Sequence, residues 1–293
     1  MAAVVHAPCW FSVLAALLAQ LWCLHARADD HRPLPEYLRD RGPGIPTSMF
    51  GTYVRQSELL VFPFVAYCYD HDREYQPSTL GYPGGQDYLG HYRDLSEQLF
   101  IAYGVTDWLA VELEGSYVQA ALQRDAADRS GTPPRIEESG LGDLEGELRG
   151  RLLRETPRWP ELFAFLEITA PSNRKQVLIG DPLWDFKPGL GVIKGFSWGT
   201  VTFRTDLEYN QDDQAWDLGE TSLEYLKRIS PVGTARLAIE GGETGAPDEW
   251  TLDSGVYWTV ADHVTLRIDN SLGVFPKAPD FTEQIGLMFS SLP

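Results

Sequence analysis

The feature that most constrains the fold is a repeated unit. From about Ser57 onward, strand-like segments of about ten or more residues alternate with turns rich in Gly, Pro and Asp. Evenly spaced segments of this kind are typical of antiparallel all-β proteins. We count twelve of them, near 57–72, 89–105, 108–123, 141–154, 161–171, 184–195, 199–210, 215–228, 234–243, 249–260, 263–274 and 280–290.

Apolar and polar residues alternate within these segments. Leu109, Val111 and Leu113 share one parity, whereas Glu112 and Glu114 share the other. Because successive side chains of a strand point to opposite faces, such a strand has one apolar and one polar face. The same alternation recurs near residues 147, 205 and 267.

The connections between the segments alternate in length. A first set is short: 106–107, 155–160, 196–198, 229–233 and 261–262. The other set is longer or richer in polar residues: 73–88, 124–140, 172–183, 211–214, 244–248 and 275–279. Short turns at one end and longer loops at the other are typical of outer-membrane barrels, whose even strand number places both termini in the periplasm.

The sequence therefore predicts an all-β fold, in which residues 48–293 form a transmembrane antiparallel up-and-down β-barrel of about 12 strands. Tryptophans beside the turns and loops, and none at a strand centre, favour two membrane interfaces. A soluble sandwich is the alternative, but it would bury some Trp in mid-strand. The predicted aromatic girdle is Trp108, Trp159, Trp184, Trp198, Trp216, Trp250 and Trp258.

The start of the chain indicates export. An apolar run from Val13 to Leu24 precedes Ala26-Arg27-Ala28, a cleavage pattern that predicts a signal peptide over residues 1–28. An uncleaved anchor is the alternative. Residues 29–47, rich in Pro and charge, are expected to form a periplasmic N-terminal segment, either folded partly into the barrel mouth or left as a disordered tail. The cleaved chain is then expected in the cell outer membrane.

The balance of charge limits the partners. The formal net charge of −18 repels phosphate backbones, so we expect no nucleic-acid binding. The expected partners are outer-membrane lipid and lipopolysaccharide, the barrel-assembly machinery and a small-molecule solute that the sequence does not identify. No cofactor is expected.

Charged residues on the polar faces would line a lumen. Unpaired charges in a narrow lumen are costly, so Arg–carboxylate pairs are expected across neighbouring strands. Two interpretations stay open: a pore that accepts cations or neutral solutes, and a lumen that the pairs plug. The predicted lumen-lining residues are Glu112, Glu114, Asp143, Glu145, Glu147, Arg149, Arg151, Glu167, Arg204, Asp206, Glu208, Arg236, Glu240, Arg267 and Asp269.

Several motifs resemble one family. Gly140-Leu141-Gly142-Asp143-Leu144-Glu145, Thr169-Ala170-Pro171 and the segment Trp184 to Gly191 are similar to the MetA-pathway of phenol degradation family of outer-membrane proteins, as is Tyr103 to Leu109. The resemblance covers roughly residues 90 to 275 and departs at Ser172-Asn173. It implies an outer-membrane barrel that transports aromatic compounds, and it assigns no binding residue.

The predicted function is a channel or transporter for passive uptake or efflux of small solutes, aromatic or apolar ones if the resemblance holds. A closed barrel with a structural or surface-interaction role is the alternative, and an outer-membrane hydrolase is the third. His71 lies between Asp70 and Asp72 and is the best candidate for an acid–base or metal group. A solvated loop edge explains it more simply, so no enzyme activity, catalytic residue or metal is expected.

Overall fold

The computed structural model describes residues 34–171, 176–180, 183–210, 214–241 and 249–292. The predicted signal peptide, residues 1–28, lies outside the described residues, as do residues 29–33 of the predicted periplasmic segment. The helical segment that the structure describes is the short 3-10 turn η2, Glu36–Leu38. Among these same residues, no helix is long and apolar enough to cross a membrane.

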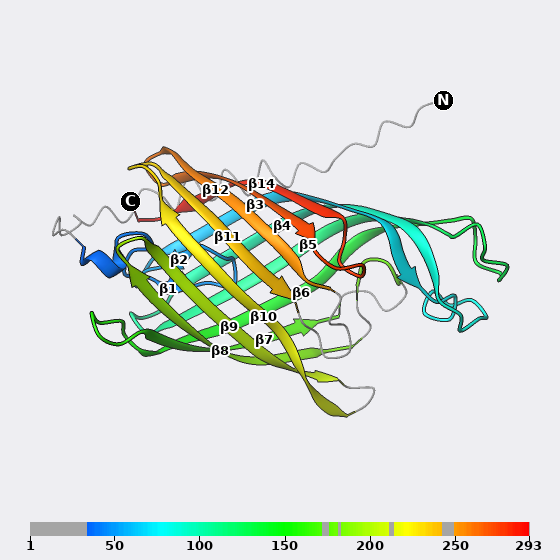
Figure 1. Ribbon diagram of the computed structural model, residues 1–293, viewed down its shortest axis with the longest axis horizontal. Helices are drawn as coiled ribbons and strands as arrows, with labels where there is room; N and C mark the ends of the chain where they lie inside the picture. Colours follow the sequence, from blue (N-terminus) through cyan, green and yellow to red (C-terminus); the bar gives the residue numbers. More distant parts are fainter. Residues whose placement is uncertain (1–33, 172–175, 181–182, 211–213, 242–248, 293) are drawn as a thin grey trace.

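Twelve strands in the described part of the chain close into a barrel (Figure 1). Each strand pairs antiparallel with its neighbours in sequence, and β14 closes the ring against β3. The predicted all-β barrel of about 12 strands is therefore confirmed. The strands are β3 (Leu59–Tyr75), β4 (Tyr88–Gly104), β5 (Leu109–Gln123), β6 (Arg135–Leu153), β7 (Glu161–Ala170), β8 (Asp185–Phe196), β9 (Gly199–Asn210), β10 (Ala215–Arg228), β11 (Gly233–Gly241), β12 (Thr251–Ala261), β13 (Val264–Gly273) and β14 (Phe281–Ser290).

The two ends of the barrel differ. We call the end with the short connections 105–108, 154–160, 197–198, 229–232 and 262–263 the turn end. We call the opposite end, where the longer connections such as 76–87 and 124–134 lie, the loop end. In Figure 1 the turn end lies on the left and the loop end on the right. The N-terminal segment enters the ring from the turn end.

The wall strands are apolar outside and polar inside. On β6, Leu144 and Leu148 are 49% and 52% exposed, whereas Glu147 and Arg149 between and beside them are 5% and 1% exposed. A closed ring of antiparallel strands places one parity of every strand on its outer surface and the other in its interior. The interior here is polar, which is the reverse of a soluble protein's core.

Strand β3 is apolar on both faces: one face lies on the outer surface of the barrel, and the other packs against apolar residues inside the ring. Val65 faces outward and is 40% exposed. Leu60, Phe62 and Phe64 face inward, and they are 2%, 1% and 4% exposed because they pack against residues inside the ring. The wall begins at Leu59, so residues 48–58, which were predicted to be part of the barrel, lie before its first strand.

Strand β10 changes parity partway along its length. The pairing of β10 with β9 shifts register between Leu218 and Thr221. An extra residue in one strand of a pair is a β-bulge, which re-aims the side chains beyond it. Simple alternation from the outward-facing Leu218 would place Glu220 on the outer face. Because of the bulge, Glu220 faces the interior instead.

Candidate lumen and the hairpin inside it

A hairpin from the N-terminal segment lies inside the barrel. Strands β1 (Ile45–Pro46) and β2 (Tyr53–Val54) pair with each other, and residues 47–52 connect them. We call residues 45–54 the lumen hairpin. Ile45 and Val54 are 1% and 0% exposed and pack in one apolar cluster with inward-facing residues of β3 and β4. The apolar inner face of β3 is thus the floor against which the hairpin docks.

A buried ion pair anchors the segment just before the hairpin. Arg41 Nη2 lies 3.0 Å from Oε2 of Glu155 and 3.0 Å from Oε2 of Glu161. The three side chains are 0%, 1% and 3% exposed. Desolvation lowers the pKa of Arg41, but the charge of Glu161 and the hydrogen bonds to both carboxylates outweigh it, so the net pKa is raised and the guanidinium stays charged.

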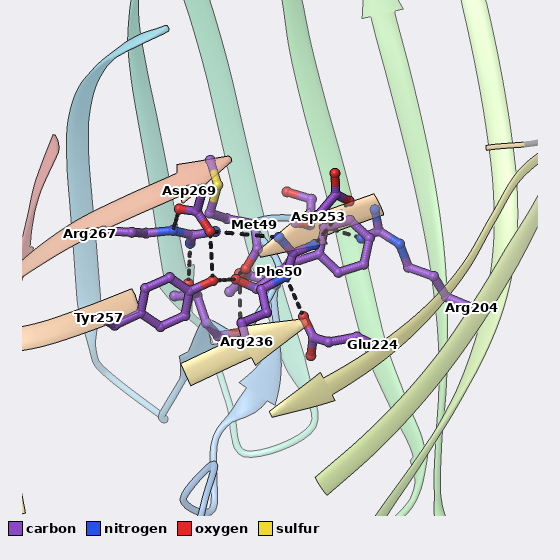
Figure 2. Close-up of polar contacts among 12 residues, drawn as sticks. Met49, Phe50, Arg204, Glu224, Arg236, Asp253, Tyr257, Arg267 and Asp269 are labelled. Atoms are coloured by element: carbon purple, nitrogen blue, oxygen red, sulfur yellow. Dashed lines mark hydrogen bonds and ion pairs between the residues drawn. The ribbon is translucent and has the colours of Figure 1, made fainter. Parts of the chain in front are cut away.

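The tip of the hairpin reaches the wall through Phe50 (Figure 2). Its ring lies between two guanidinium groups, with Arg204 Cζ 3.6 Å and Arg236 Cζ 4.4 Å from the ring centroid. The Tyr257 hydroxyl donates to the Phe50 carbonyl oxygen at 3.0 Å. Gly51 follows with a φ of +71°, and a Cβ there would overlap the Tyr257 ring, so the tip requires glycine.

The remaining tip contacts use backbone and hydroxyl groups. Ser48 donates from its backbone nitrogen and its hydroxyl to Glu112 Oε2, at 2.8 and 2.6 Å. Arg204 donates to the Ser48 carbonyl at 3.0 Å, and Arg267 donates to the Thr52 hydroxyl at 2.9 Å. The hairpin is therefore fixed to at least three wall strands, and it narrows the lumen where it docks.

Desolvation also acts on the hairpin's own titratable group. It raises the pKa of the Tyr53 phenol far above its usual range, with the nearby charge of Glu224 acting in the same direction. Tyr53 therefore stays neutral, and Arg41 lies against its ring, with Cζ 5.4 Å from the centroid.

Ion pairs link neighbouring wall strands around the hairpin tip. Arg149 on β6 lies 2.5 Å from Glu147 and 3.6 Å from Glu112 on β5. Its guanidinium also stacks near the rings of Phe163 and Phe165, at 5.2 and 4.8 Å. Because these groups are almost fully buried, each depends on the others to offset the cost of desolvation.

A second set of pairs surrounds Arg236 on β11. Its guanidinium lies 3.2 Å from Glu224 on β10, 3.6 Å from Asp253 on β12 and 3.6 Å from Asp269 on β13. Arg267 lies 2.5 Å from Asp269 on the same strand. Four adjacent strands are thus joined by one network, which Figure 2 shows around the hairpin tip.

A cavity of about 310 Å³ lies on the loop side of the tip. Ser48, Met49 and Phe50 form part of its lining, and charged side chains from strands around the ring form most of the rest. The lining includes seven carboxyl groups and four basic groups, a formal excess of three negative charges. They are Glu114, Glu145, Glu167, Glu220, Glu240, Asp253 and Asp269, with Lys187, Arg204, Arg236 and Arg267.

The structure places every predicted lumen-lining residue away from the exposed outer surface. Eight of the fifteen line the cavity: Glu114, Glu145, Glu167, Arg204, Arg236, Glu240, Arg267 and Asp269. Glu112, Glu147, Arg149 and Asp206 are 3%, 5%, 1% and 8% exposed, and Asp143, Arg151 and Glu208 are partly buried. Arg151 belongs to the turn end, where it lies 3.0 Å from Glu161.

The predicted girdle residues lie at both ends of the barrel. Trp108, Trp159, Trp198 and Trp258 lie near the turn end, and Trp184, Trp216 and Trp250 near the loop end. Six of them are 45% to 66% exposed: Trp108, Trp159, Trp184, Trp198, Trp216 and Trp258. Their role at a membrane interface remains a prediction.

Sequence reasoning missed several interior residues. Glu224 and Asp253 follow the inward parity of strands β10 and β12, so extending the alternation to those segments would have found them. The bulge in β10 hid Glu220. The same parity of β12 places Tyr257 inside, but its hydrogen bond to the Phe50 carbonyl had no local signal, and neither had the position of Phe50, because both come from contacts between distant segments.

Two possible catalytic features can be placed. His71 Nδ1 lies 2.7 Å from Asp280 Oδ2, and Asp70 offers a carboxylate oxygen within 4.8 Å of both residues' ligand atoms, so these three side chains are close enough together to hold a metal ion. Gly195 to Gly199, Gly-Phe-Ser-Trp-Gly, also fits the G-x-S-x-G pattern of a nucleophilic serine. A nucleophilic serine in that pattern needs a strand-to-helix turn, whereas Ser197 lies in the tight turn between β8 and β9.

Comparison with known proteins supports the fold. No protein-family profile matches the chain, and no curated protein sequence matches it either. The specific resemblance to the phenol-degradation family therefore stays a prediction.

The chain is similar in structure to an outer membrane channel from Pseudomonas putida F1, with 13% identity, a TM-score of 0.57, and coverage of 91% of this chain and 100% of that one. The translocator domain of the autotransporter NalP from Neisseria meningitidis has 10% identity and a TM-score of 0.47, with 95% of this chain and 96% of that chain covered. A mutant of the monoaromatic hydrocarbon channel TodX has 10% identity and a TM-score of 0.40, with 80% of this chain and 90% of that chain covered. At these identities the likeness shows the fold alone, and the two lower TM-scores carry no argument. The chain has the fold of an outer-membrane β-barrel.

Proposed function

We propose that the chain is a passive outer-membrane channel for small polar solutes, with a preference for cations. The observation that carries this proposal is the cavity above the hairpin tip, with its seven carboxylates and four basic groups. A narrow passage lined by an excess of one charge concentrates ions of the opposite sign and repels the others. The turn end would face the periplasm and the loop end the outside.

The solute is the finer part of the proposal. Aromatic or apolar compounds, which the family resemblance implies, would cross a cavity whose lining is mostly charged. Polar and cationic solutes fit that lining better, because its carboxylates replace part of their hydration. We also propose outer-membrane lipid, lipopolysaccharide and the barrel-assembly machinery as partners, because they follow from an outer-membrane location.

The test is the reversal potential of the purified protein in a planar lipid bilayer under a KCl gradient. The expected result is discrete conductance steps with K⁺ preferred over Cl⁻. The variant Glu114→Gln/Glu145→Gln removes two lining carboxylates and should reduce that preference. Glu283→Gln, which removes a charge from the exposed outer face of β14, is the matched control and should leave it unchanged. Conductance without cation preference would refute the proposed selectivity.

A closed barrel with a structural role is the second candidate, and the lumen hairpin is the observation in its favour. The hairpin docks against the inner face of β3 and β4 and contacts the arginines of the opposite wall. If this candidate holds, bilayers stay silent and liposomes take up neither cationic nor aromatic probes. A lipase or esterase activity of the wild type that His71→Ala abolishes would instead support the hydrolase.

A further inference from the structure

The pairing of charges around the cavity leaves three carboxylates over. Each of the four basic groups has a carboxylate partner in the lining: Arg204 with Glu220 at 2.6 Å, Arg267 with Asp269 at 2.5 Å, Arg236 with Asp253 at 3.6 Å, and Lys187 with Glu167 at 3.7 Å. Glu114, Glu145 and Glu240 remain. Within the described part of the chain, none of these three has a basic group within 4.0 Å.

Two of the three remaining carboxylates face each other. Glu114 on β5 and Glu145 on β6 are direct partners in the register of the two strands. Like charges placed directly opposite on adjacent strands destabilise a sheet. Because this repulsion lowers the stability of the sheet, a positively charged group bound between the two side chains would offset it.

The third carboxylate comes from the other side of the ring. Glu240 lies on β11, six strands from β5 in the circular order of the barrel. Its Oε2 atom is inaccessible to solvent and has no hydrogen-bond partner among the described residues. Oδ2 of Asp253, which also lines the cavity, has no hydrogen-bond partner either, but Arg236 Nη2 lies 3.6 Å from it and supplies a counter-charge. A buried carboxylate oxygen without a donor or a counter-charge is costly, and that of Glu240 therefore indicates a ligand that brings donors of its own.

The chemistry of that ligand follows from the lining. A cationic ligand rich in N–H donors fits this lining best, because the unpaired groups are carboxyl groups, which in their ionised form only accept hydrogen bonds. A volume of about 310 Å³ is at the lower end of the range for small organic ligands and is far larger than one metal ion needs. The unpaired carboxylates lie on opposite walls, so a ligand with a charge at each end can contact both.

We propose that this cavity binds a small linear organic diammonium ion, with one ammonium group between Glu114 and Glu145 and the other at Glu240. The inference deepens the proposed channel function by naming a class of solute. Binding itself does not require conduction, so the two ideas can fail separately.

The experiment is isothermal titration calorimetry of the full mature chain in detergent with 1,4-diaminobutane. The triple variant Glu114→Gln/Glu145→Gln/Glu240→Gln should bind at least about a hundredfold more weakly, because each lost charge-assisted hydrogen bond weakens binding by about tenfold. Glu283→Gln, with its charge on the outer face, should bind like the wild type. Heat-dependent migration on a gel checks folding, and removing the opposed glutamate charges should not lower the unfolding temperature.

Four other outcomes decide against the proposed binding site. No binding to the wild type overturns it, as does equal binding by the triple variant. Equal affinity for 1-aminobutane would show that the second ammonium group contributes nothing. Binding of MgCl₂ in place of the diamine would assign the site to a divalent metal ion. Diamine binding by a protein that gives no bilayer conductance would refute the channel and leave the binding site intact.

Discussion

Replacing Arg41 with alanine should release the lumen hairpin while leaving the barrel closed. Arg41 lies four residues before the hairpin, and its buried guanidinium lies 3.0 Å from both Glu155 and Glu161. The barrel wall does not depend on Arg41, because its strands are held by their own backbone pairing around the whole ring. The hairpin and the wall can therefore be perturbed separately.

The free-energy cost of removing Arg41 depends on which ion-pair partners Glu155 and Glu161 retain. Breaking a buried ion pair by removing one partner costs about 3–5 kcal/mol. Here Glu155 retains Lys194 Nζ at 3.0 Å, and Glu161 retains Arg151 Nε at 3.0 Å. Because neither carboxylate is left alone, we expect the low end, about 3 kcal/mol, which raises the population of the released hairpin about a hundredfold.

Hydrogen exchange read by mass spectrometry measures this release directly. The Thr47 backbone nitrogen donates to the Thr52 carbonyl at 2.9 Å, so the amides of peptides covering residues 45–54 are protected only while the hairpin is docked. In Arg41→Ala these peptides should exchange about a hundredfold faster. Peptides from β5 and β6 should exchange at the wild-type rate.

The matched control is Arg39→Ala. Arg39 lies two residues away. Its side chain is 46% exposed, lies 3.8 Å from Asp40 and donates to the Ser197 carbonyl, so its loss should cost only about 1 kcal/mol. Unchanged protection of residues 45–54 in Arg41→Ala would refute the argument, and so would an equal loss of protection in both variants. Heat-dependent gel migration excludes a general failure to fold.

Three further changes test other parts of the structure. Phe50→Leu removes the ring between two guanidinium groups and should weaken hairpin docking by about 2 kcal/mol in the same exchange assay; wild-type protection would contradict the stacking. Gly191→Ala places a Cβ into the Phe163 ring and should destabilise the barrel by about 1–3 kcal/mol in urea unfolding, whereas Gly150→Ala, with its nearest atom 3.9 Å away, should be neutral. Leu113→Arg, at an outward position that is 47% exposed, should cost about 2–4 kcal/mol in folding into lipid vesicles, while Leu113→Met should be tolerated; equal stability of both would argue against a lipid-facing wall.

The barrel wall could be predicted because its signal is local. On β5 and β6 the alternation of leucines with glutamates and arginines spans several consecutive residues, and a period of two fixes which side chains share a face. Loop lengths then fix the ends. None of this requires knowledge of which distant segments meet.

The lumen hairpin could not be predicted because its partners are distant in sequence. The segment Leu59 to Tyr69 carried a trace of it, since apolar residues on both parities indicate that the inner face also contacts something apolar. Nothing in that segment identifies Ile45 and Val54 as the contact. The bulge at Leu218 to Thr221 is a similar case, because one extra residue reverses the parity on which face assignments depend.

The composition of the hairpin tip separates the size of the lumen from its charge. Residues 47–52 are Thr-Ser-Met-Phe-Gly-Thr and carry no charged side chain. They offer an aromatic ring, carbonyl oxygens and hydroxyls to Arg204, Arg236 and Arg267, so they occupy these arginines without neutralising them. The arginines stay available to Glu220, Glu224 and Asp269, and the negative excess of the cavity does not depend on docking.

Releasing the hairpin should therefore widen the passage while leaving its preference for cations in place, whereas replacing Glu114 and Glu145 should change the preference and leave the width. A hairpin variant that altered ion selectivity as strongly as conductance would show that the two are coupled, and that the tip itself sets the field in the lumen.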